Sequence, residues 1–149
     1  MDKLALPVSG FYTLEIRERG QRVGFKIITL DGKQAIFAHV GFKTRERMGK
    51  YGLDLSALET IGVAALREAV RERWLVVIDE IGPMEIRSAI FRDVLSEAFD
   101  TGLPILATIT ARSFPFTDAT KKRPDATVIE VRPDNREQLV SEVSHQFMA

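Results

Sequence analysis

The sequence contains no cysteine, and this absence removes several kinds of chemistry at once. Disulfide bonds, thiolate catalysis and cysteine-based zinc sites are all excluded. Histidine is scarce as well, because His39 and His145 are the two in the chain and lie far apart in the sequence. A histidine-rich metal site is therefore not expected, and carboxylates are the metal-binding candidates that remain.

A bias of charge and a long hydrophobic run are also lacking. The 21 Lys and Arg residues equal the 21 Asp and Glu residues in number, so no global field favours nucleic acid or an anionic membrane. No apolar run approaches the roughly 20 residues that span a bilayer, and residues 1–7 lack the pattern of a signal peptide. We expect a cytoplasmic protein with no membrane partner. Its 149 residues, 45% of them hydrophobic, are enough for a single domain over 1–149.

Two periodic patterns divide the chain. Alternating apolar residues and the turn residues Gly20 and Asp31-Gly32 predict an antiparallel meander over residues 8–40, followed by a polar, glycine-bearing surface loop over 41–55. Strand and helix patterns then alternate, which implies a mostly parallel sheet flanked by helices. The expected elements are helix 56–71 with a Ser-x-x-Glu capping box, strand 73–79, helix 84–100, strand 104–110, loop 111–124, strand 126–131 and a last helix ending near 147. The predicted fold class is α/β with an N-terminal antiparallel β-meander.

The most informative stretch is the apolar run that ends in Asp79 and Glu80 and is followed at once by Gly82-Pro83. An apolar run bounded by turn residues is typical of a strand buried on both faces of a parallel sheet, and ligands of such sheets bind at the carboxyl ends of the strands. One carboxylate there can hold Mg²⁺, and its neighbour can orient or deprotonate an attacking water. The alternative is that the acids cap the next helix or meet solvent.

Several segments, taken in order, resemble the THEP1-type nucleoside-triphosphatase family, and the similarity covers essentially the whole chain. They are Gly10-Phe11-Tyr12-Thr13, Val23-Gly24-Phe25-Lys26, Gly49-Lys50-Tyr51-Gly52-Leu53, Val77-Ile78-Asp79-Glu80-Ile81-Gly82-Pro83-Met84-Glu85, Ala107-Thr108, Arg123-Pro124-Asp125 and Asn135-Arg136. The resemblance implies a P-loop, RecA-like fold that hydrolyses nucleoside triphosphates to diphosphates with Mg²⁺. It also implies that Asp79 is the Walker B acid that binds Mg²⁺ and that Glu80 is the water-orienting base.

The Gly-x-x-x-x-Gly-Lys-[Ser/Thr] loop that such a family carries near its start is missing from the 149 residues. Gly49-Lys50 comes nearest, but position 44 is Thr and position 51 is Tyr, so we reject it as a phosphate loop. Because this loop holds the phosphates and Mg²⁺, we expect the chain as written to hydrolyse nucleoside triphosphates weakly or not at all. Three explanations stay open: a naturally truncated protein, a misplaced start site and an expression fragment.

The resemblance has a structural consequence as well, because the family's phosphate-loop strand lies between the strands that correspond to 104–110 and 126–131. Either these two strands pair with each other, or each keeps an exposed edge. An exposed apolar edge invites another chain, so we expect a second copy or a rearranged segment to cover it. Homo-oligomerisation through the sheet edge is the resulting partner prediction.

Further candidates carry open alternatives. Lys50 and Tyr51 either contact nucleotide or shape their loop, and Arg112 either points at a γ-phosphate or is a solvated loop residue. Glu85 either joins the acidic site or occupies a first helical turn, and Phe114-Pro115-Phe116 either stacks on a base or folds onto the core. Two function classes follow: a Mg²⁺-dependent nucleoside-triphosphatase, or a non-catalytic partner-binding or self-assembling remnant. A nucleic-acid partner is not expected, because no basic stripe with aromatic residues is present.

Overall fold

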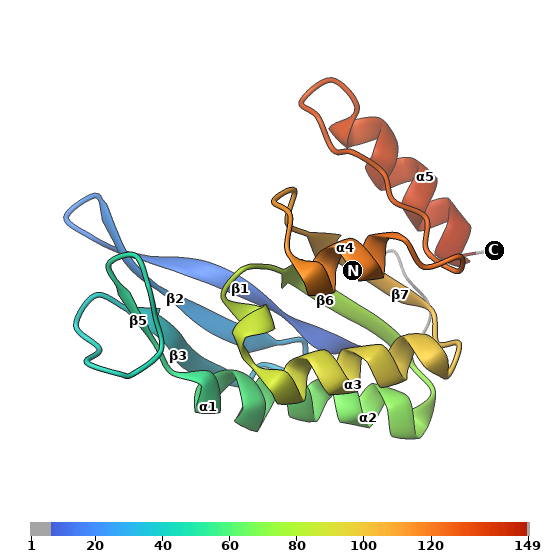
Figure 1. Cartoon of the computed structure of the whole chain (residues 1–149). Helices are drawn as coiled ribbons and strands as arrows, with labels where there is room; N and C mark the ends of the chain where they lie inside the picture. Colours follow the sequence, from blue (N-terminus) through green and yellow to red (C-terminus); the bar gives the residue numbers. More distant parts are fainter. Residues whose placement is uncertain (1–6, 149) are drawn as a thin grey trace.

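The computed structural model describes residues 7–148; the first six residues, which include most of the stretch lacking a signal-peptide pattern, and Ala149 lie outside it. A curled sheet has helices along one side of it, and a C-terminal helix stands apart from it (Figure 1). The strands are β1 (Val8–Glu18), β2 (Gln21–Thr29), β3 (Gln34–His39), β4 (Arg47–Met48), β5 (Tyr51–Leu53), β6 (Leu75–Ile81) and β7 (Ile105–Ile109). The helices are α1 (Leu55–Ala57), the π-helix η1 (Leu58–Val63), α2 (Ala64–Glu72), the 3₁₀ helix η2 (Glu85–Arg87), α3 (Ala89–Asp100), α4 (Pro115–Lys121) and α5 (Arg136–Met148).

The sheet is mixed, with the strand order β4-β5-β3-β2-β1-β6-β7. The expected antiparallel meander is present, since β1 pairs with β2 and β2 with β3 in antiparallel fashion. In residues 7–148 parallel pairing joins β1 to β6 and β6 to β7, whereas every other neighbouring pair is antiparallel. The expected mostly parallel sheet is therefore confirmed only in part. The predicted loop 41–55 also contains the short hairpin β4–β5, which extends the antiparallel side.

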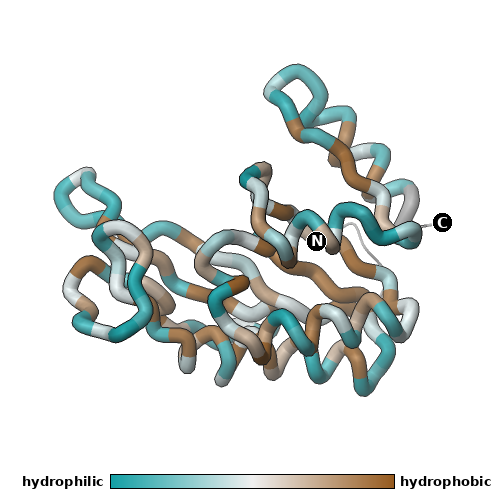
Figure 2. Tube along the Cα trace, in the orientation of Figure 1, coloured by the Kyte–Doolittle hydropathy of each residue, from teal (hydrophilic) through white to brown (hydrophobic). Residues whose placement is uncertain are grey.

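The main core lies between the sheet and the helices η1, α2 and α3. Phe11 of β1 and Phe91 of α3 are both fully buried, and their rings meet edge to face with centroids 6.0 Å apart. Gly62 in η1 lets the helix approach this pair, because a Cβ there would lie 2.7 Å from the Ile27 side chain and 3.3 Å from Phe11. Figure 2 shows hydrophobic colour along the inner strands and hydrophilic colour at the exposed hairpin tips. Burial of these apolar faces is the main source of stability for the sheet–helix sandwich.

The helical segment that the sequence predicts over 56–71 is confirmed, but its cap differs from the expected one. Asp54, not Ser56, is the N-cap of α1, and its side chain accepts a hydrogen bond from the Ser56 backbone N–H at 3.1 Å. Glu59, the expected capping-box partner, instead accepts a hydrogen bond from the Ser88 hydroxyl at 2.6 Å. The Ser-x-x-Glu pattern was therefore correct about the start of a helix and wrong about the cap.

The single helix expected over 84–100 is divided by Ser88. Its backbone is extended, with φ −83° and ψ 116°, so η2 ends before it and α3 begins after it. The Ser88 hydroxyl accepts a hydrogen bond from the Phe91 N–H at 3.1 Å and so caps α3. The apolar spacing continues across the break, which is why the periodicity alone did not reveal it.

The C-terminal third departs most from expectation. The predicted loop 111–124 contains α4, which begins with Pro115 at its first turn, a position that suits proline. Phe116 of α4 packs against the main core, which supports the core alternative for this aromatic group. The predicted strand 126–131 is not a strand in the structure but irregular chain, and its Val128, Ile129 and Val131 are 47–61% exposed. A strand pattern produces a strand only where a neighbouring strand accepts its hydrogen bonds.

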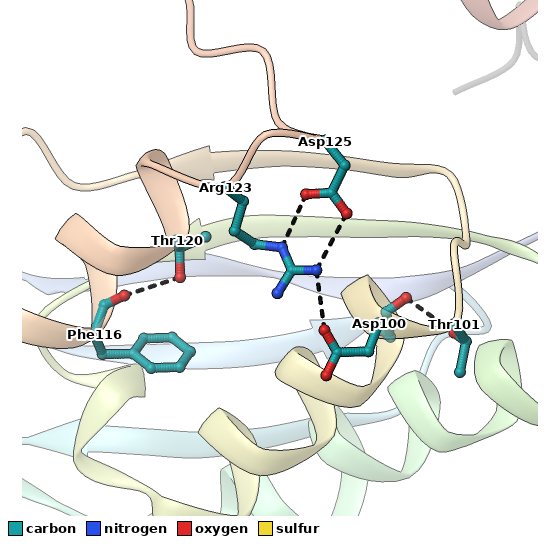
Figure 3. A network of polar contacts seen from close by, with 7 residues as sticks. Asp100, Thr101, Phe116, Thr120, Arg123 and Asp125 are labelled. Atoms are coloured by element: carbon teal, nitrogen blue, oxygen red, sulfur yellow. Dashed lines mark hydrogen bonds and ion pairs between the residues drawn. The ribbon is translucent and has the colours of Figure 1, made fainter.

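Arg123, which follows α4, is bound by a hydrogen bond and an ion pair to Asp100 at the end of α3 (Figure 3). Its guanidinium donates hydrogen bonds to both carboxylate oxygens of Asp125, at 2.9 and 3.1 Å, and to Asp100 at 3.0 Å. It also lies 4.9 Å from the centre of the Phe99 ring. Arg123-Pro124-Asp125, one of the segments that carry the family resemblance, thus has a structural role: it links the chain after α4 to the end of α3.

None of the helices in residues 7–148 combines the length and the apolar composition that crossing a bilayer requires.

Candidate functional site

Asp79 and Glu80 lie in an irregularity near the carboxyl end of β6. The pairing of β6 with β7 runs regularly to Ile78 opposite Ala107 and resumes at Ile81 opposite Ile109. Two residues of β6 therefore face a single residue of β7, Thr108, as in a β-bulge. Bulges commonly re-aim side chains next to active sites. The strand ends at Ile81 and not at Asp79. The two acids are therefore among the last residues of the strand and not in the loop that follows it.

Asp79 is exposed and anchored by its neighbour on β7. The Thr108 hydroxyl donates a hydrogen bond of 2.6 Å to Asp79 Oδ1, which leaves Oδ2 available to a ligand. On the other side, Asp79 is the last residue of β6 that pairs with β1, opposite Tyr12. The carboxylate thus lies where β6 leaves its pairing with β1, close to the carboxyl ends of β6 and β7. The carboxyl ends of parallel strands are the expected ligand-binding edge of such a sheet.

Glu80 and Glu85 approach each other over Gly82. A Cβ placed on Gly82 would lie 2.7 Å from Glu85 Oε1 and 2.9 Å from Glu80 Oε1, so both carboxyl groups border the space that this glycine leaves open. Partial burial and the nearby Asp79 charge raise the pKa of Glu80. Glu85 is only 5% exposed, and burial raises its pKa to about 7. Perturbed carboxyl groups of this kind are typical of functional sites.

Lys50 and Tyr51 lie at the β4–β5 hairpin, with β3, β2 and β1 between them and β6 in the sheet order. Tyr51 is 6% exposed, and its hydroxyl accepts a hydrogen bond from Arg22 at 2.9 Å. The Lys50 ammonium lies 5.4 Å from the Tyr51 ring centre and is exposed. Their contact with nucleotide stays a prediction, and the structure gives Tyr51 a packing role in addition.

This hairpin is nevertheless tied to the acidic segment. Met84, which follows Gly82-Pro83, packs against the small cluster formed by Ala38, Tyr51 and Leu53. Arg87 of η2 forms an ion pair of 3.1 Å with Glu46 in the loop before β4. The curl of the sheet therefore brings the loop 41–50 to the segment that carries Glu85, although its strands are distant in the sheet order.

Arg112 follows the carboxyl end of β7, which is parallel to β6, so it lies at the same end of these strands as the acids. Its side chain is exposed, and its guanidinium carbon lies 5.2 Å from the centre of the Phe114 ring. Its backbone N–H donates to the Thr110 hydroxyl at 3.2 Å. A role toward a γ-phosphate stays a prediction, and the contact with Phe114 shows what holds the side chain in this structure.

The oxygen ligands fit a Mg²⁺ ion that is held jointly with a substrate. No group of three or more Asp, Glu or His side chains suited to a metal is found in residues 7–148. Mg²⁺ is commonly bound by one or two carboxylates together with substrate phosphates and water, rather than by an all-protein cage. Asp79, with one free and exposed oxygen, matches that pattern.

A small polar hollow of about 100 Å³ lies away from the acids, toward the other end of β1. Ser9, Thr29, Asp31, Lys33 and Glu68 are among the residues that line it. Ser9 pairs with Val76 and Tyr12 with Asp79, so the hollow and the acids lie at different levels of the strands.

Two participants in the site were not assigned a definite role from the sequence. Thr108 is a polar residue in an otherwise apolar strand, and this contrast is the sequence feature that could have indicated its role beside Asp79. Glu85 begins η2, as one of its two alternatives expects, but its burial beside Glu80 depends on the turn at Gly82 and Pro83. No local sequence pattern predicts that Glu85 lies beside Glu80.

Comparisons with known proteins identify the family to which the chain belongs. The sequence model of the family described as NTPase matches residues 1–144. A nucleoside-triphosphatase THEP1 from Thermotoga sp. (strain RQ2) is 43% identical over 143 residues, which are 96% of this chain and 82% of that protein. The crystal structure of THEP1 from Aquifex aeolicus superposes with a TM-score of 0.87 at 32% identity, covering 95% of this chain and 84% of that one. The solution structure of a human cancer-related nucleoside triphosphatase superposes with a TM-score of 0.78 at 31% identity, covering 94% and 81%. The chain therefore belongs to the THEP1-type nucleoside-triphosphatase family.

Proposed function

We propose that this chain carries the acidic half of a Mg²⁺-dependent site that hydrolyses nucleoside triphosphates to diphosphates and phosphate. Asp79 holds Mg²⁺ through its free oxygen, and Glu80 orients and deprotonates the attacking water. The observation that supports these roles is the bulge opposite Thr108, which presents two adjacent carboxylates near the carboxyl ends of the parallel strands β6 and β7. Bound Mg²⁺ would neutralise charge on the phosphates.

Thr108 and Arg112 support the same arrangement from β7. The Thr108 hydrogen bond limits the rotation of Asp79, which keeps its second oxygen directed away from β7. Arg112 supplies an exposed cation beyond the same strand end, at a place where a phosphate could be bound. Lys50 is the further basic candidate, on the hairpin that Met84 and Arg87 link to the acidic segment.

We expect the 149-residue chain to turn over slowly, because its sequence contains no Gly-x-x-x-x-Gly-Lys-[Ser/Thr] loop to hold the phosphates. Positioning of reactants accounts for about 7–11 kcal/mol of barrier lowering in well-aligned systems. Phosphate release from ATP and GTP with Mg²⁺ should remain near the buffer background. Calorimetry should detect little nucleotide binding, with or without Mg²⁺.

Glu80→Gln is the matched control for this measurement. Enzyme-like phosphate release that falls about 10²- to 10⁴-fold in Glu80→Gln would refute the expected weakness and support the role of Glu80. Enzyme-like release that is unchanged in the variant would refute the assigned role.

The second candidate function is a self-assembling, non-catalytic family member, which the free edge of β7 favours. In residues 7–148 β7 pairs with β6 alone, and the exposed apolar segment around Ile129 lies in the following part of the chain. Unprotected apolar edges promote association between copies. We expect light scattering after gel filtration to give the mass of an oligomer that Ile129→Lys converts to a monomer.

Ile36→Lys is the control for this association, because Ile36 is 46% exposed and Ile129 is 47% exposed. Ile36 lies on β3, on the far side of β1 and β6 from the free edge. Ile36→Lys should leave the mass unchanged. A wild-type chain that stays monomeric at high concentration would contradict the self-assembly alternative.

A further inference from the structure

The charge of the chain is balanced as a whole but not locally. Two segments, residues 15–22 and 41–50, together carry seven Lys and Arg residues against three Glu residues. We call these segments the basic hairpin surface, and its cations are Arg17, Arg19, Arg22, Lys43, Arg45, Arg47 and Lys50. The side chains of all seven are exposed. Because the rest of the chain holds more acids than bases, the equal totals conceal a region of positive potential.

The two segments lie side by side at the hairpin end of the sheet. Residues 15–22 form the turn between β1 and β2, residues 41–50 form the loop that contains β4, and both project past the helices (Figure 1). A hydrogen bond of 2.9 Å from Arg22 to the Tyr51 hydroxyl joins them. The centre of the Tyr51 ring is 5.9 Å from the Arg22 guanidinium carbon and 5.4 Å from the Lys50 ammonium. The cations of the two segments therefore belong to one surface.

The acids of this surface do not neutralise it. Glu15 is shared by two arginines, at 2.8 Å from Arg17 and 3.4 Å from Arg22. Glu46 pairs at 3.1 Å with Arg87, which lies outside the surface. Five cations of the surface form no ion pair with any residue of the described chain: Arg19, Lys43, Arg45, Arg47 and Lys50. The surface thus presents a group of exposed positive charges without a partner in the described chain.

We propose that the basic hairpin surface binds the phosphate backbone of a nucleic-acid duplex without reading its sequence. Phosphates are closely spaced anions, and exposed Lys and Arg residues gain affinity for them by displacing counterions. The Arg22 guanidinium is held by the Tyr51 hydroxyl and lies 5.2 Å from the centre of the Phe25 ring, so it loses little freedom when it binds a phosphate.

The aromatic residues of this region favour a duplex over a single strand. Proteins that hold single strands stack the bases on open aromatic rings. Tyr51 is 6% exposed and Phe25 is half-buried, so neither ring is open to a base. Contacts with the backbone are the ones that the exposed cations can make, and such contacts carry no sequence information.

This inference replaces the expectation from the sequence that no nucleic acid binds. That expectation rested on the balanced total charge and on the lack of a basic stripe with aromatic residues along the chain. Folding brings together two short basic segments that residues 23–40 separate in the sequence. The charge of the whole chain therefore does not describe the charge of this surface.

The test is fluorescence anisotropy of a labelled duplex DNA that is titrated with the full chain at several salt concentrations. If each of the five cations without an ion pair contacts one phosphate, the logarithm of the binding constant should fall with the logarithm of the salt concentration with a slope of about −4.5. The affinity should then drop about 500-fold between about 50 and 200 mM salt. A duplex of unrelated sequence should bind equally well.

Lys43→Ala combined with Arg45→Ala should weaken binding and reduce the steepness of this slope by about 2, because two phosphate contacts are lost. The matched control combines Arg67→Ala with Lys122→Ala. It removes the same charge from two exposed side chains, on α2 and directly after α4, that also form no ion pair in the described chain. The control should keep the wild-type slope.

A duplex that does not bind at about 50 mM salt would overturn the proposal. Equal changes of slope in the two double variants would also overturn it, because net charge and not this surface would then cause the binding. Vesicles that contain phosphatidylserine and bind the chain when the duplex does not would assign the surface to a membrane instead. The measurement contains no nucleoside triphosphate, so its outcome is separate from the hydrolysis assay and from the roles of Asp79 and Glu80.

Discussion

Replacing Glu85 with glutamine is expected to remove about 3 kcal/mol of pH dependence from the free energy of unfolding between about pH 4 and pH 8. Burial raises the pKa of Glu85 from 4.5 to about 7 in the folded protein. Below pH 4.5 both states carry the proton and the group has no effect on stability. Between these two values the unfolded state loses its proton first, so stability falls as the pH rises. Above pH 7 the loss is complete and constant.

Urea unfolding followed by circular dichroism at several pH values checks this expectation. The difference in unfolding free energy between Glu85→Gln and wild type should grow in favour of the variant as the pH rises through this range. Glu85→Asp is the control, since it keeps a titrating carboxyl group and should retain a falling stability even if its overall stability differs. Parallel pH profiles for wild type and Glu85→Gln would show that Glu85 is not held in a desolvated environment.

Gly10→Ala is expected to destabilise the fold by about 4 kcal/mol, as strain and a backbone clash combine. Gly10 lies in β1 opposite Val77 with φ +147°, and a Cβ there would come within 1.8 Å of the Val77 carbonyl oxygen. Relief requires β1 and β6 to separate where they are hydrogen-bonded. Because Val77 lies two residues before Asp79, the same separation should also disturb the acidic site.

Gly20→Ala separates the clash from the backbone conformation. Gly20 has φ +78°, but no heavy atom lies within 4 Å of a Cβ placed there. Alanine should therefore cost about 1–2 kcal/mol, the usual penalty of a left-handed residue. Urea titrations of the two variants measure the difference, and equal losses would mean that the close approach of β1 and β6 does not constrain position 10.

Predictions that rest on local pattern fared well where one strand or helix carries its own signal. The meander over 8–40, the helical segment after Asp54 and the apolar strand that carries Asp79 and Glu80 all appear in the structure, although that strand ends at Ile81. Family membership also followed from the sequence, because the segment around Asp79 is specific and the accompanying segments occur in the expected order.

Expectations failed where the outcome depends on distant neighbours. Residues 126–131 have the composition of a strand, yet they pair with no strand of the described chain, and the edge of β7 that was expected as their possible partner stays free. Ser88 continues an apolar helical stripe, yet its contacts with Glu59 and Phe91 end one helix and start another. The expected mostly parallel sheet was confirmed in part, since the antiparallel side includes the unforeseen hairpin β4–β5. The roles of Asp79, Glu80, Lys50, Tyr51 and Arg112 stay predictions, as do the compartment and the single-domain assignment.

The sequence by itself determined the family, the adjacency of two carboxylates after an apolar strand and the absence of cysteine chemistry, because these are properties of neighbouring residues or of composition. Only the tertiary structure decided that Thr108 donates a hydrogen bond to Asp79 and that the carboxyl groups of Glu80 and Glu85 both border the space over Gly82. Those contacts depend on strand register and on the fold of a turn, which are set by packing between segments far apart in the chain. Desolvation, which raises the pKa of Glu85, is likewise a property of the packed protein and not of any sequence window.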